Sequence, residues 1–587
     1  MTHKQKDSQS FVGRVPRTPL VFLILLGGCS GEISSSRDGS RGDVDARSAV
    51  EVPLKRLGKI EYTNTLRDLF AVTAPQASPA VLDELAGLMS QYPDDAITGR
   101  SGDVHGGFSR LDHTVTQTHA DVAYAVAVEA GRALTRTPER LKELAGACAT
   151  DTDSGNDIPC VEGLVRTFGE LALRRPPTAD DVAFYGSAAG PAPVSPEAWA
   201  DVITLLLASP DSLYHVQNGG GEVDGTTTHA LTPYELASRL SYHFLQTMPD
   251  AALLADARSG ALAKPEVYAA QVDRLVEDPR ARGTADAFFG QWLRLKELEP
   301  LTSRLGDPVF EAFVGADRPS PNLHRLVLDE VLDLAWWVTK RGGSVAELLT
   351  NRSNFARDAE LAKLYGASAW DGVGEPPVLP DPNRAGLVTR VAFLATGSAN
   401  TRPIMKGLRI RSALLCDTLG PPPPEAMGAV VELSPNNTTR QTVEALTEAR
   451  GTNCPACHAT LLNPLGFATE NFDALGRVRT HQALFDGTGQ KIAEKPVDTR
   501  TVPRVDPGDD RTSNGAADMT RFLVESGRVD ACLARQYFRF SFGRIEDESA
   551  DAAVLEALTQ SARAEGLVQL LKVVAFRPEF KQRSFHE

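Results

Sequence analysis

Apolar residues recur every three or four positions through most of the chain, which is the periodicity of amphipathic helices. Near the start of this pattern, Leu57, Tyr62 and Leu66 fall on one helix face. The clearest helix start is Thr232 to Glu235, with an N-cap hydroxyl, a proline at the first helical position and a capping-box glutamate. Helices are also predicted at 112–134, 161–174, 202–208, 266–277, 281–297, 321–340, 355–365, 384–396, 403–418, 516–526, 529–543 and 551–575.

Strand-like alternation is concentrated in residues 477–505. There, Val478, Leu484 and Val497 lie on either side of Asp486-Gly487-Thr488-Gly489, a sequence typical of a hairpin turn. A proline run at 421–424 predicts a short, stiff spacer between helical blocks. The pattern therefore predicts a mainly α fold of several packed helical modules, with a minor β-hairpin region.

Residues 1–28 have the layout of an export signal. Lys4, Lys6, Arg14 and Arg17 precede an apolar run at 20–26 that is too short to span a bilayer. The mature protein is therefore expected outside the cytoplasm.

Leu26-Gly27-Gly28-Cys29 resembles a bacterial lipobox, which predicts that Cys29 is lipidated and becomes the new N-terminus. An ordinary secretory signal cut nearby is the alternative. Ser30 directly after the cysteine resembles the outer-membrane version of such signals. We expect a lipid-anchored protein at the periplasmic face or the surface of the outer membrane, with residues 29–50 as a flexible polar tether.

Charge limits the partners. The chain of 587 residues has a formal net charge of −15 at pH 7, which argues against nucleic acid or anionic lipid as a partner. After the signal, no apolar run approaches the length that crosses a bilayer. The predicted contact with the membrane is therefore the lipid alone.

One short motif, Cys454-Pro455-Ala456-Cys457-His458, predicts a cofactor. Two cysteines three apart with a histidine after the second are the signature of covalent haem attachment. On a helix, Cys454 and His458 are i and i+4 neighbours, so the thiols can reach the porphyrin vinyl groups while the imidazole faces the iron. We predict haem c on Cys454 and Cys457, with His458 as the proximal ligand. A CxxC disulfide or half of a zinc site remains an alternative, although zinc would need two further ligands.

The residues after the motif suggest how the imidazole is held. A ligating histidine usually donates its second ring N–H to a carbonyl, and Pro464 is the predicted acceptor. Nearby apolar residues are either a dry wall around the haem or plain core: Leu461, Leu462, Leu465, Phe467 and Phe472. For the sixth iron position, Met405 is the first candidate, with Met427, Met519 and His481 also possible.

The other cysteines fit an oxidising compartment. Cys148 and Cys160 flank a loop rich in Gly, Asp and Ser, which predicts a local disulfide. Cys416 and Cys532 then remain, either as a second bridge or as buried thiols.

Longer motifs run along nearly all of the chain after the signal. They are Arg56-Leu57 with 61–69, 168–177, 234–242, Arg384-Ala385-Gly386-Leu387, 403–407, the proline run, the CxxCH motif, 463–467 with 471–477, and 532–544. In this order they resemble the modules of the planctomycete-type secreted proteins of unknown function, which include a cytochrome-c-like CxxCH module. The resemblance implies a mostly helical, exported, haem-bearing protein, and the family has no settled reaction.

The chain also departs from that family pattern. Residues 397–402 replace a histidine-containing turn, so no distal histidine is expected there. His243 replaces a commoner apolar residue, and its expected place is a helix surface.

The predicted organisation follows from these motifs. It is a signal peptide (1–28), a tether (29–50), an N-terminal helical module (51–147), a second helical module (148–228), a central helical module (229–366), a small cytochrome-like module (367–510) and a C-terminal helical module (511–587).

Three functions remain open at this stage. The first is an electron-transfer lipoprotein with one haem c, whose partner is a periplasmic or surface redox protein. The second is a haem-dependent oxidoreductase with a substrate cleft, for which Glu61, Glu235 and Arg239 are candidates. The third is a structural or binding lipoprotein in which the CxxC pair is a disulfide. We favour the first.

Overall fold

The structure is a computed structural model that describes residues 54–99, 106–223, 228–384, 386–420, 434–449, 451 and 454–584. The predicted signal, lipobox and tether, with Cys29, lie outside the described residues, as do the proline run and Met427. The described chain is mainly helical with small antiparallel sheets, which confirms the predicted fold class. None of its helices combines the length and the apolarity needed to cross a bilayer.

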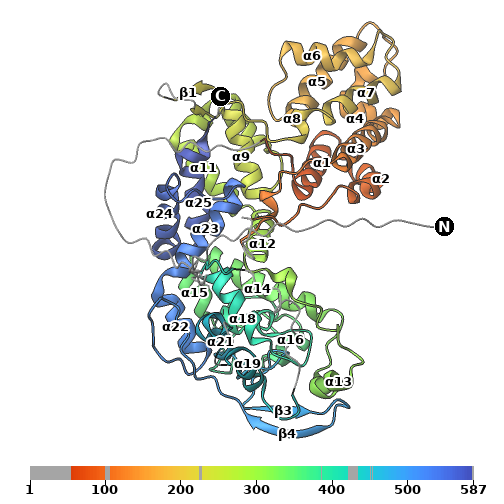
Figure 1. Ribbon diagram of the computed structural model, residues 1–587. Coiled ribbons are helices and arrows are strands. Elements are labelled where there is room, and N and C mark those ends of the chain that lie inside the picture. Colours follow the sequence, from red (N-terminus) through yellow and green to blue (C-terminus); the bar gives the residue numbers. More distant parts are fainter. Residues whose placement is uncertain are drawn as a thin grey trace, which may run out of the picture.

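Eight N-terminal helices form one group, at the upper right of Figure 1. They are α1 (Lys59–Thr73), α2 (Ser78–Ser90), α3 (Gln117–Thr135), α4 (Pro138–Ala145), α5 (Asp157–Leu173), α6 (Ala179–Gly186), α7 (Pro196–Leu207) and α8 (Pro210–Leu213). Their apolar faces share one core, which also takes in Tyr242 and Met248. The helices α3 and α7 approach so closely that a Cβ on Gly131 would lie 2.4 Å from the Ala200 carbonyl oxygen.

A second core, separate from a small cluster of Leu394, Phe472 and Ala516, contains Phe108 and residues from Leu231 to Phe580. Its first helices are α9 (Pro233–Leu245), α10 (Ala251–Arg258), α11 (Pro265–Glu277), α12 (Ala281–Trp292), α13 (Pro308–Val314), α14 (Leu323–Lys340), α15 (Val345–Thr350) and α16 (Ala359–Leu364). The predicted start of α9 is confirmed, because the Thr232 hydroxyl accepts from the Glu235 N–H and the Glu235 carboxylate accepts from the Thr232 N–H. The predicted domain boundaries stay predictions.

The region that contains the CxxCH motif lies in the lower part of Figure 1, with α14 above it and α13 and α16 beside it. Its elements are α17 (Val391–Leu394), α18 (Pro403–Arg409), a π-helical turn (Ile410–Leu414), α19 (Thr439–Thr447), α20 (Cys454–Cys457), a second π-helical turn (His458–Leu462), α21 (Asn463–Phe467), β3 (His481–Phe485) and β4 (Lys491–Pro496). The strands β3 and β4 pair antiparallel around Asp486 to Gly489, which confirms the predicted hairpin.

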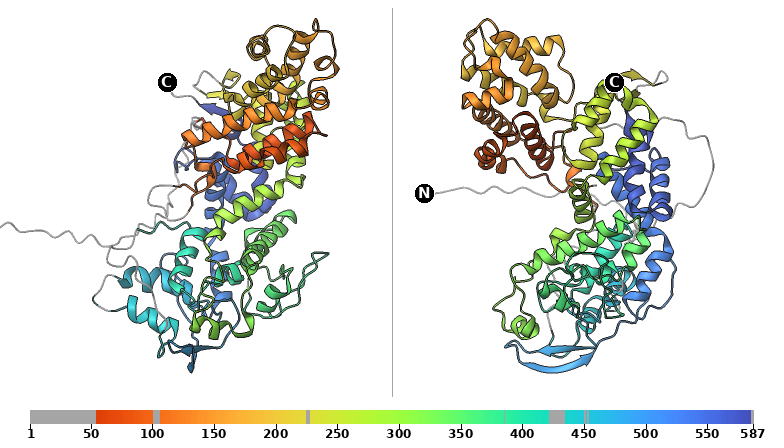
Figure 2. Two further views of the ribbon diagram at one scale, coloured as in Figure 1. Left: turned by 90° about the vertical axis from the view of Figure 1, so that its right-hand side faces the viewer. Right: turned by 180° about the vertical axis from the view of Figure 1, so that it is seen from behind.

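Five C-terminal helices return to the central helices: α22 (Ala516–Ser526), α23 (Arg528–Phe542), α24 (Ala552–Gln560), α25 (Leu567–Phe576) and α26 (Pro578–Lys581). The end of the chain adds strand β5 (Gln582–Ser584) to β1 (Gly221–Glu222) and β2 (Thr228–Ala230), in the antiparallel order β1-β2-β5. Figure 2 shows the C-terminal helices against the central ones from behind.

Several predicted helices differ from the observed ones: 281–297 ends as α12 at Trp292, and 403–418 changes to a π-helical turn after Arg409. Two others are interrupted near glycines. Residues 384–396 were expected as one helix, yet they form a 3₁₀ turn (Leu387–Thr389) and the short α17. Gly386 has φ +68° and its Cα approaches the Leu349 carbonyl so closely that a Cβ would overlap it, so the backbone cannot continue as a helix there. Residues 551–575 are broken at Gly566, which has φ +93°.

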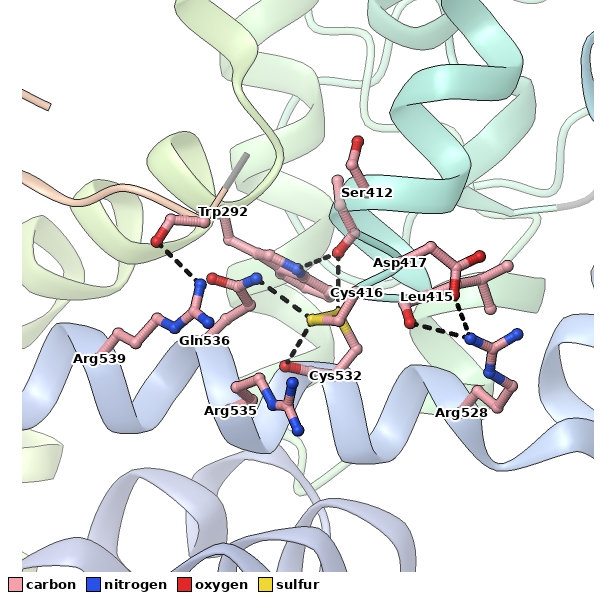
Figure 3. The surroundings of a disulfide bond; sticks show 12 residues. Trp292, Ser412, Leu415, Cys416, Asp417, Arg528, Cys532, Arg535, Gln536 and Arg539 are labelled. Carbon is pink, nitrogen blue, oxygen red and sulfur yellow. Dashed lines mark hydrogen bonds and ion pairs between the residues drawn. A yellow bond between two sulfur atoms is a disulfide. The ribbon is translucent and has the colours of Figure 1, made fainter. Parts of the chain in front are cut away.

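Both predicted pairs of cysteines are joined. A disulfide links Cys148, before α5, to Cys160 within it, and another links Cys416 to Cys532 on α23. Figure 3 shows the second bridge, where the Gln536 amide donates to the Cys416 sulfur (3.3 Å). This bridge ties the segment after α18 to the C-terminal helices. Disulfides are the chemistry of an oxidising compartment, so they support a location outside the cytoplasm.

Candidate functional site

The CxxCH motif begins a continuous helical stretch, from α20 through the π-helical turn into α21. Residues 454–461, apart from the exposed Ala456, are half-buried, whereas residues 462–470 are buried throughout. The sulfur and imidazole groups therefore lie at the accessible end of a helix whose other end is anchored in the core.

Two glycines fix this stretch against α18. A Cβ on Gly407 would lie 2.0 Å from the Leu462 carbonyl oxygen, and a Cβ on Gly466 would lie 2.0 Å from that of Pro403. Any larger residue would push the helices apart. Beyond this contact, Arg411 donates from Nε to the Leu461 carbonyl (3.1 Å). The backbone that carries His458 is thus held in place by close packing.

The His458 imidazole has a matching neighbour in Asn463. The imidazole Nδ1 and the Asn463 Oδ1 are both buried without a hydrogen-bond partner. The Asn463 amide is oriented by its Nδ2, which donates to the Thr447 hydroxyl (3.0 Å) and the Glu448 carboxylate (2.8 Å). A donor N–H at Nδ1 and an acceptor at Oδ1 would satisfy each other.

Burial lowers the pKa of His458, and the Asn463 side chain and Glu448 oppose that shift without cancelling it. The imidazole is therefore neutral at neutral pH, which is the form that ligates a metal.

Pro464, the predicted acceptor for the second ring N–H, is buried in α21, and its carbonyl accepts from the Ala468 N–H (3.3 Å). Asn463 is better placed for this role, because Pro464 is already used within the helix. Asn463 was not predicted from the sequence as the partner of the His458 ring. Residues 458 and 463 are five apart, and a π-helical turn is what brings such residues onto one face.

The cysteines of the CxxC pair differ in state from the other described cysteines. The structure keeps Cys454 and Cys457 as thiols while the other described cysteines form disulfides. Within the described ranges, no three His, Cys, Asp or Glu side chains gather as a metal site would require. Two thiols and a neutral imidazole on one helix are consistent with covalent haem.

The structure gives less support to the residues predicted as a haem wall and as the sixth iron ligand than to His458. Leu462, Leu465, Phe467 and Phe472 are all buried, which fits plain core as well as a haem wall. Met405 is 56% exposed. It lies about 200° around α18 from both Pro403 and Gly407, so it is on the far side from the contact with α21. The structure therefore does not support Met405 as the sixth ligand, which stays a prediction.

The other candidate ligands are dispersed. Met519 is fully buried in the second core, and His481 begins β3 with an exposed side chain. Neither position identifies it as an iron ligand.

Two of the three candidates for a substrate cleft do come together. Glu61 and Arg239 line one cavity of about 70 Å³ between the N-terminal helices, α9 and the end of α23. Glu235 has a structural role instead: its carboxylate caps α9 and accepts from the backbone of Asn218 and Gly219.

His243 was expected on a helix surface, and this prediction was wrong. Its side chain is only 4% exposed, and its Nε2 lies 3.1 Å from the Tyr537 hydroxyl on α23. The ring also contacts Phe580 edge to face. This face of α9 is covered by elements some 300 residues later in the sequence, so local pattern could not show it.

Comparison with known proteins finds two family matches along the chain. Residues 231–367 match the family described as PSD4, Protein of unknown function (DUF1592), and residues 384–482 match PSCyt3, Protein of unknown function (DUF1588). No curated protein and no solved structure matches the chain. The CxxCH motif, α18 and α21 all lie within the second match. The chain therefore carries two planctomycete-type domains of unknown function, PSD4 and the cytochrome-like PSCyt3, as the sequence resemblance predicted.

Proposed function

We propose that the protein is an exported, lipid-anchored cytochrome with one covalent haem c, which passes electrons to or from a periplasmic or surface redox protein. The observation that carries this proposal is the pair of thiols at Cys454 and Cys457, on one helical turn with a neutral His458, in the PSCyt3 region. Haem c is attached only after export, which agrees with the two disulfides elsewhere in the chain.

Each residue has a distinct part in this proposal. Cys454 and Cys457 would hold the porphyrin through thioether bonds, and His458 would ligate the iron through Nε2. Asn463 accepts the Nδ1 hydrogen, which fixes the ring orientation and the tautomer. When bound, the haem supplies reversible one-electron chemistry.

The setting suits electron transfer. Close packing of Gly407 and Gly466 keeps the motif helix from shifting, so little rearrangement accompanies a change of charge. The half-buried motif residues leave one side of the site near the surface, within reach of a docking redox protein.

The test is expression in the periplasm of a host with the haem attachment machinery. We expect the purified protein to gain the mass of one haem and to show the absorbance bands of reduced haem c. A variant with Cys454→Ala and Cys457→Ala should lack both signals. The matched control is Cys148→Ala with Cys160→Ala, which removes the same number of sulfur atoms far from the motif and should keep the haem.

A haem-dependent oxidoreductase is a second candidate, and the exposure of Met405 favours it. If no protein side chain fills the sixth position, the iron can bind small ligands. Carbon monoxide added to the reduced protein separates the two proposals. A shifted absorbance spectrum would favour the oxidoreductase, and an unchanged spectrum would favour electron transfer.

A further inference from the structure

The cavity that contains Glu61 and Arg239 has a chemistry that the proposed cytochrome function does not use. Its polar lining consists mainly of Lys55, Glu61, Arg110, His215, Arg239 and His243. These residues come from both cores, so the cavity forms only when the N-terminal helices pack against α9 and α23.

Short backbone contacts bring Lys55 and His215 to the same wall. The Leu57 N–H donates to the Leu213 carbonyl (2.8 Å), and the His215 N–H donates to that of Lys55 (2.8 Å). The Glu61 carboxylate completes this wall through Oε2, which accepts from the Gly58 N–H (3.0 Å) and lies 3.0 Å from His215 Nε2.

Two cations in the cavity have unused donors. Arg110 is 8% exposed and donates from Nη2 to the carbonyls of Tyr242 (3.1 Å) and His243 (3.2 Å), while its Nε is buried with no partner. The Lys55 ammonium makes no hydrogen bond or ion pair to any residue that the structure describes. Lys55 is half-buried, so its ammonium loses part of its hydration without a protein partner to compensate.

The charges around the cavity do not balance. Lys55, Arg110 and Arg239 are three cations, and Glu61 is the one carboxylate in the described lining. Burial lowers the pKa of both lining histidines, so these rings are neutral and add no charge. Burial also lowers the pKa of Lys55 despite the nearby Glu61, and that of Arg239 to about 10. The wall therefore has an excess of positive charge.

The same wall also offers acceptors. Glu61 uses only Oε2, and its Oε1 makes no hydrogen bond within the described part of the chain. The His243 Nδ1 is buried without a partner. The Tyr537 hydroxyl can donate to the Leu571 carbonyl (3.2 Å) and accept from His243 Nε2, which makes Nδ1 the acceptor nitrogen. A ligand must then both accept from cations and donate a hydrogen.

We propose that this cavity binds a small oxyanion that carries its own hydroxyl, such as hydrogen phosphate or a short hydroxycarboxylate. The oxyanion accepts from Lys55 and Arg110, and its O–H donates to Glu61 Oε1 or His243 Nδ1. The cavity has a volume of about 70 Å³, which limits it to a ligand of a few non-hydrogen atoms. Gly543 lines both this cavity and a larger hollow of about 560 Å³ beside Asp112 and His113.

Titration calorimetry on the whole exported protein, at fixed ionic strength and neutral pH, tests the proposal with four anions. Phosphate and glycolate carry a hydroxyl, whereas sulfate and acetate do not. We expect phosphate to bind about 10-fold or more tightly than sulfate, and glycolate likewise relative to acetate, because the hydroxyl satisfies a buried acceptor. Tighter binding of phosphate than of glycolate would indicate a phosphate site, and the reverse order would indicate a hydroxycarboxylate site.

Two variants assign the binding to this cavity. Lys55→Met should weaken phosphate about 10-fold or more, while the control Lys59→Met should not, since the Lys59 ammonium binds Ser90 and Asp94 on the surface. Glu61→Gln should narrow the gap between phosphate and sulfate, because its amide can donate where the carboxylate could only accept.

Clear outcomes would overturn the proposal. They are no heat with either phosphate or glycolate, equal affinity for phosphate and sulfate in the unmodified protein, or a Lys55→Met variant that folds and binds as before. If Lys55→Met does not fold, the proposal is still tested by the ratio of phosphate to sulfate affinity in the unmodified protein and in Glu61→Gln. None of these results depends on whether haem is attached.

Discussion

Two lysines, the buried Lys406 and the half-buried Lys55, lie one in each half of the molecule and have opposite surroundings. Lys406 on α18 is 8% exposed, and its ammonium donates to the Thr469 hydroxyl (2.8 Å) and the Glu470 carboxylate (3.2 Å). Lys55 lines the cavity, and no described residue gives its ammonium a partner. Removing one partner of a buried ion pair leaves an uncompensated charge, whereas an unpaired cation beside a cavity is available to an anionic ligand.

The carboxylate that pairs with Lys406 has further hydrogen-bond and ion-pair partners. Glu470 also pairs with Arg479 (3.0 Å) and accepts from the Thr401 hydroxyl (2.9 Å). This cluster fixes α18 against the segment after α21, behind the CxxCH helix. The cytochrome-like region is thus a rigid scaffold whose reactive groups lie at its accessible edge, while the cavity is a recess with uncompensated charge.

The largest expected effect tests whether the two regions work separately. The variant with Cys454→Ala and Cys457→Ala should lose all covalent haem, and its phosphate affinity should equal that of the unmodified protein. Conversely, Lys55→Met should keep one haem per chain. Intact mass and calorimetry on the same preparations measure both properties. Loss of haem and of phosphate binding together, in a folded variant, would contradict separate sites.

The next effect concerns the paired lysine. Glu470→Leu leaves the Lys406 ammonium buried without its carboxylate, and we expect the free energy of unfolding to fall by about 3–5 kcal/mol. Adding Lys406→Met should restore part of this loss, because the buried charge is then gone. Denaturant titration of the single and double variants measures the coupling. A double variant less stable than Glu470→Leu alone would show that Lys406 is not the source of the loss.

The unpaired lysine should behave in the opposite way. In phosphate-free buffer, Lys55→Met removes a charge that has no partner, so the free energy of unfolding should stay within about 1 kcal/mol or rise. With saturating phosphate, the unmodified protein should gain stability and the variant should not. Thermal unfolding with and without phosphate checks this, and a large loss in phosphate-free buffer would assign Lys55 a structural role.

The smallest effect is a dependence on pH. Burial lowers the pKa of Lys55 in the folded state below its ordinary 10.5, so the folded protein favours the neutral amine. The cost of the charged form is therefore present at low pH and disappears as pH rises through the folded pKa toward 10.5. The stability of the unmodified protein relative to Lys55→Met should rise over that window in phosphate-free buffer. A fall in relative stability over that window would mean that folding raises the pKa of Lys55 and does not lower it.

The contrast between the two regions also shows what sequence can predict. The CxxCH motif is contiguous, and the cap of α9 needs only residues 232–235, so both follow from local rules. The cavity draws on Lys55, Arg110 and His243, which no local pattern connects. His243 was misplaced because α23 and Phe580, which cover it, are remote in sequence.

Asn463 was missed for a different reason. Its position beside His458 depends on a π-helical turn, in which residues five apart share a face. The sequence analysis predicted only one helical turn, from Cys454 to His458, and in a regular helix Asn463 would lie well to one side of His458. Sequence spacing predicts the neighbours of a reactive side chain least well where the helix departs from regular geometry.

The mass of the intact protein, after export from a host that attaches haem, tests the central claim most directly. We expect one haem per chain, lost when Cys454 and Cys457 are replaced and retained when Cys148 and Cys160 are replaced. A bare polypeptide two hydrogens lighter than its thiol form at Cys454 and Cys457 would contradict the account, since the motif would then be a disulfide.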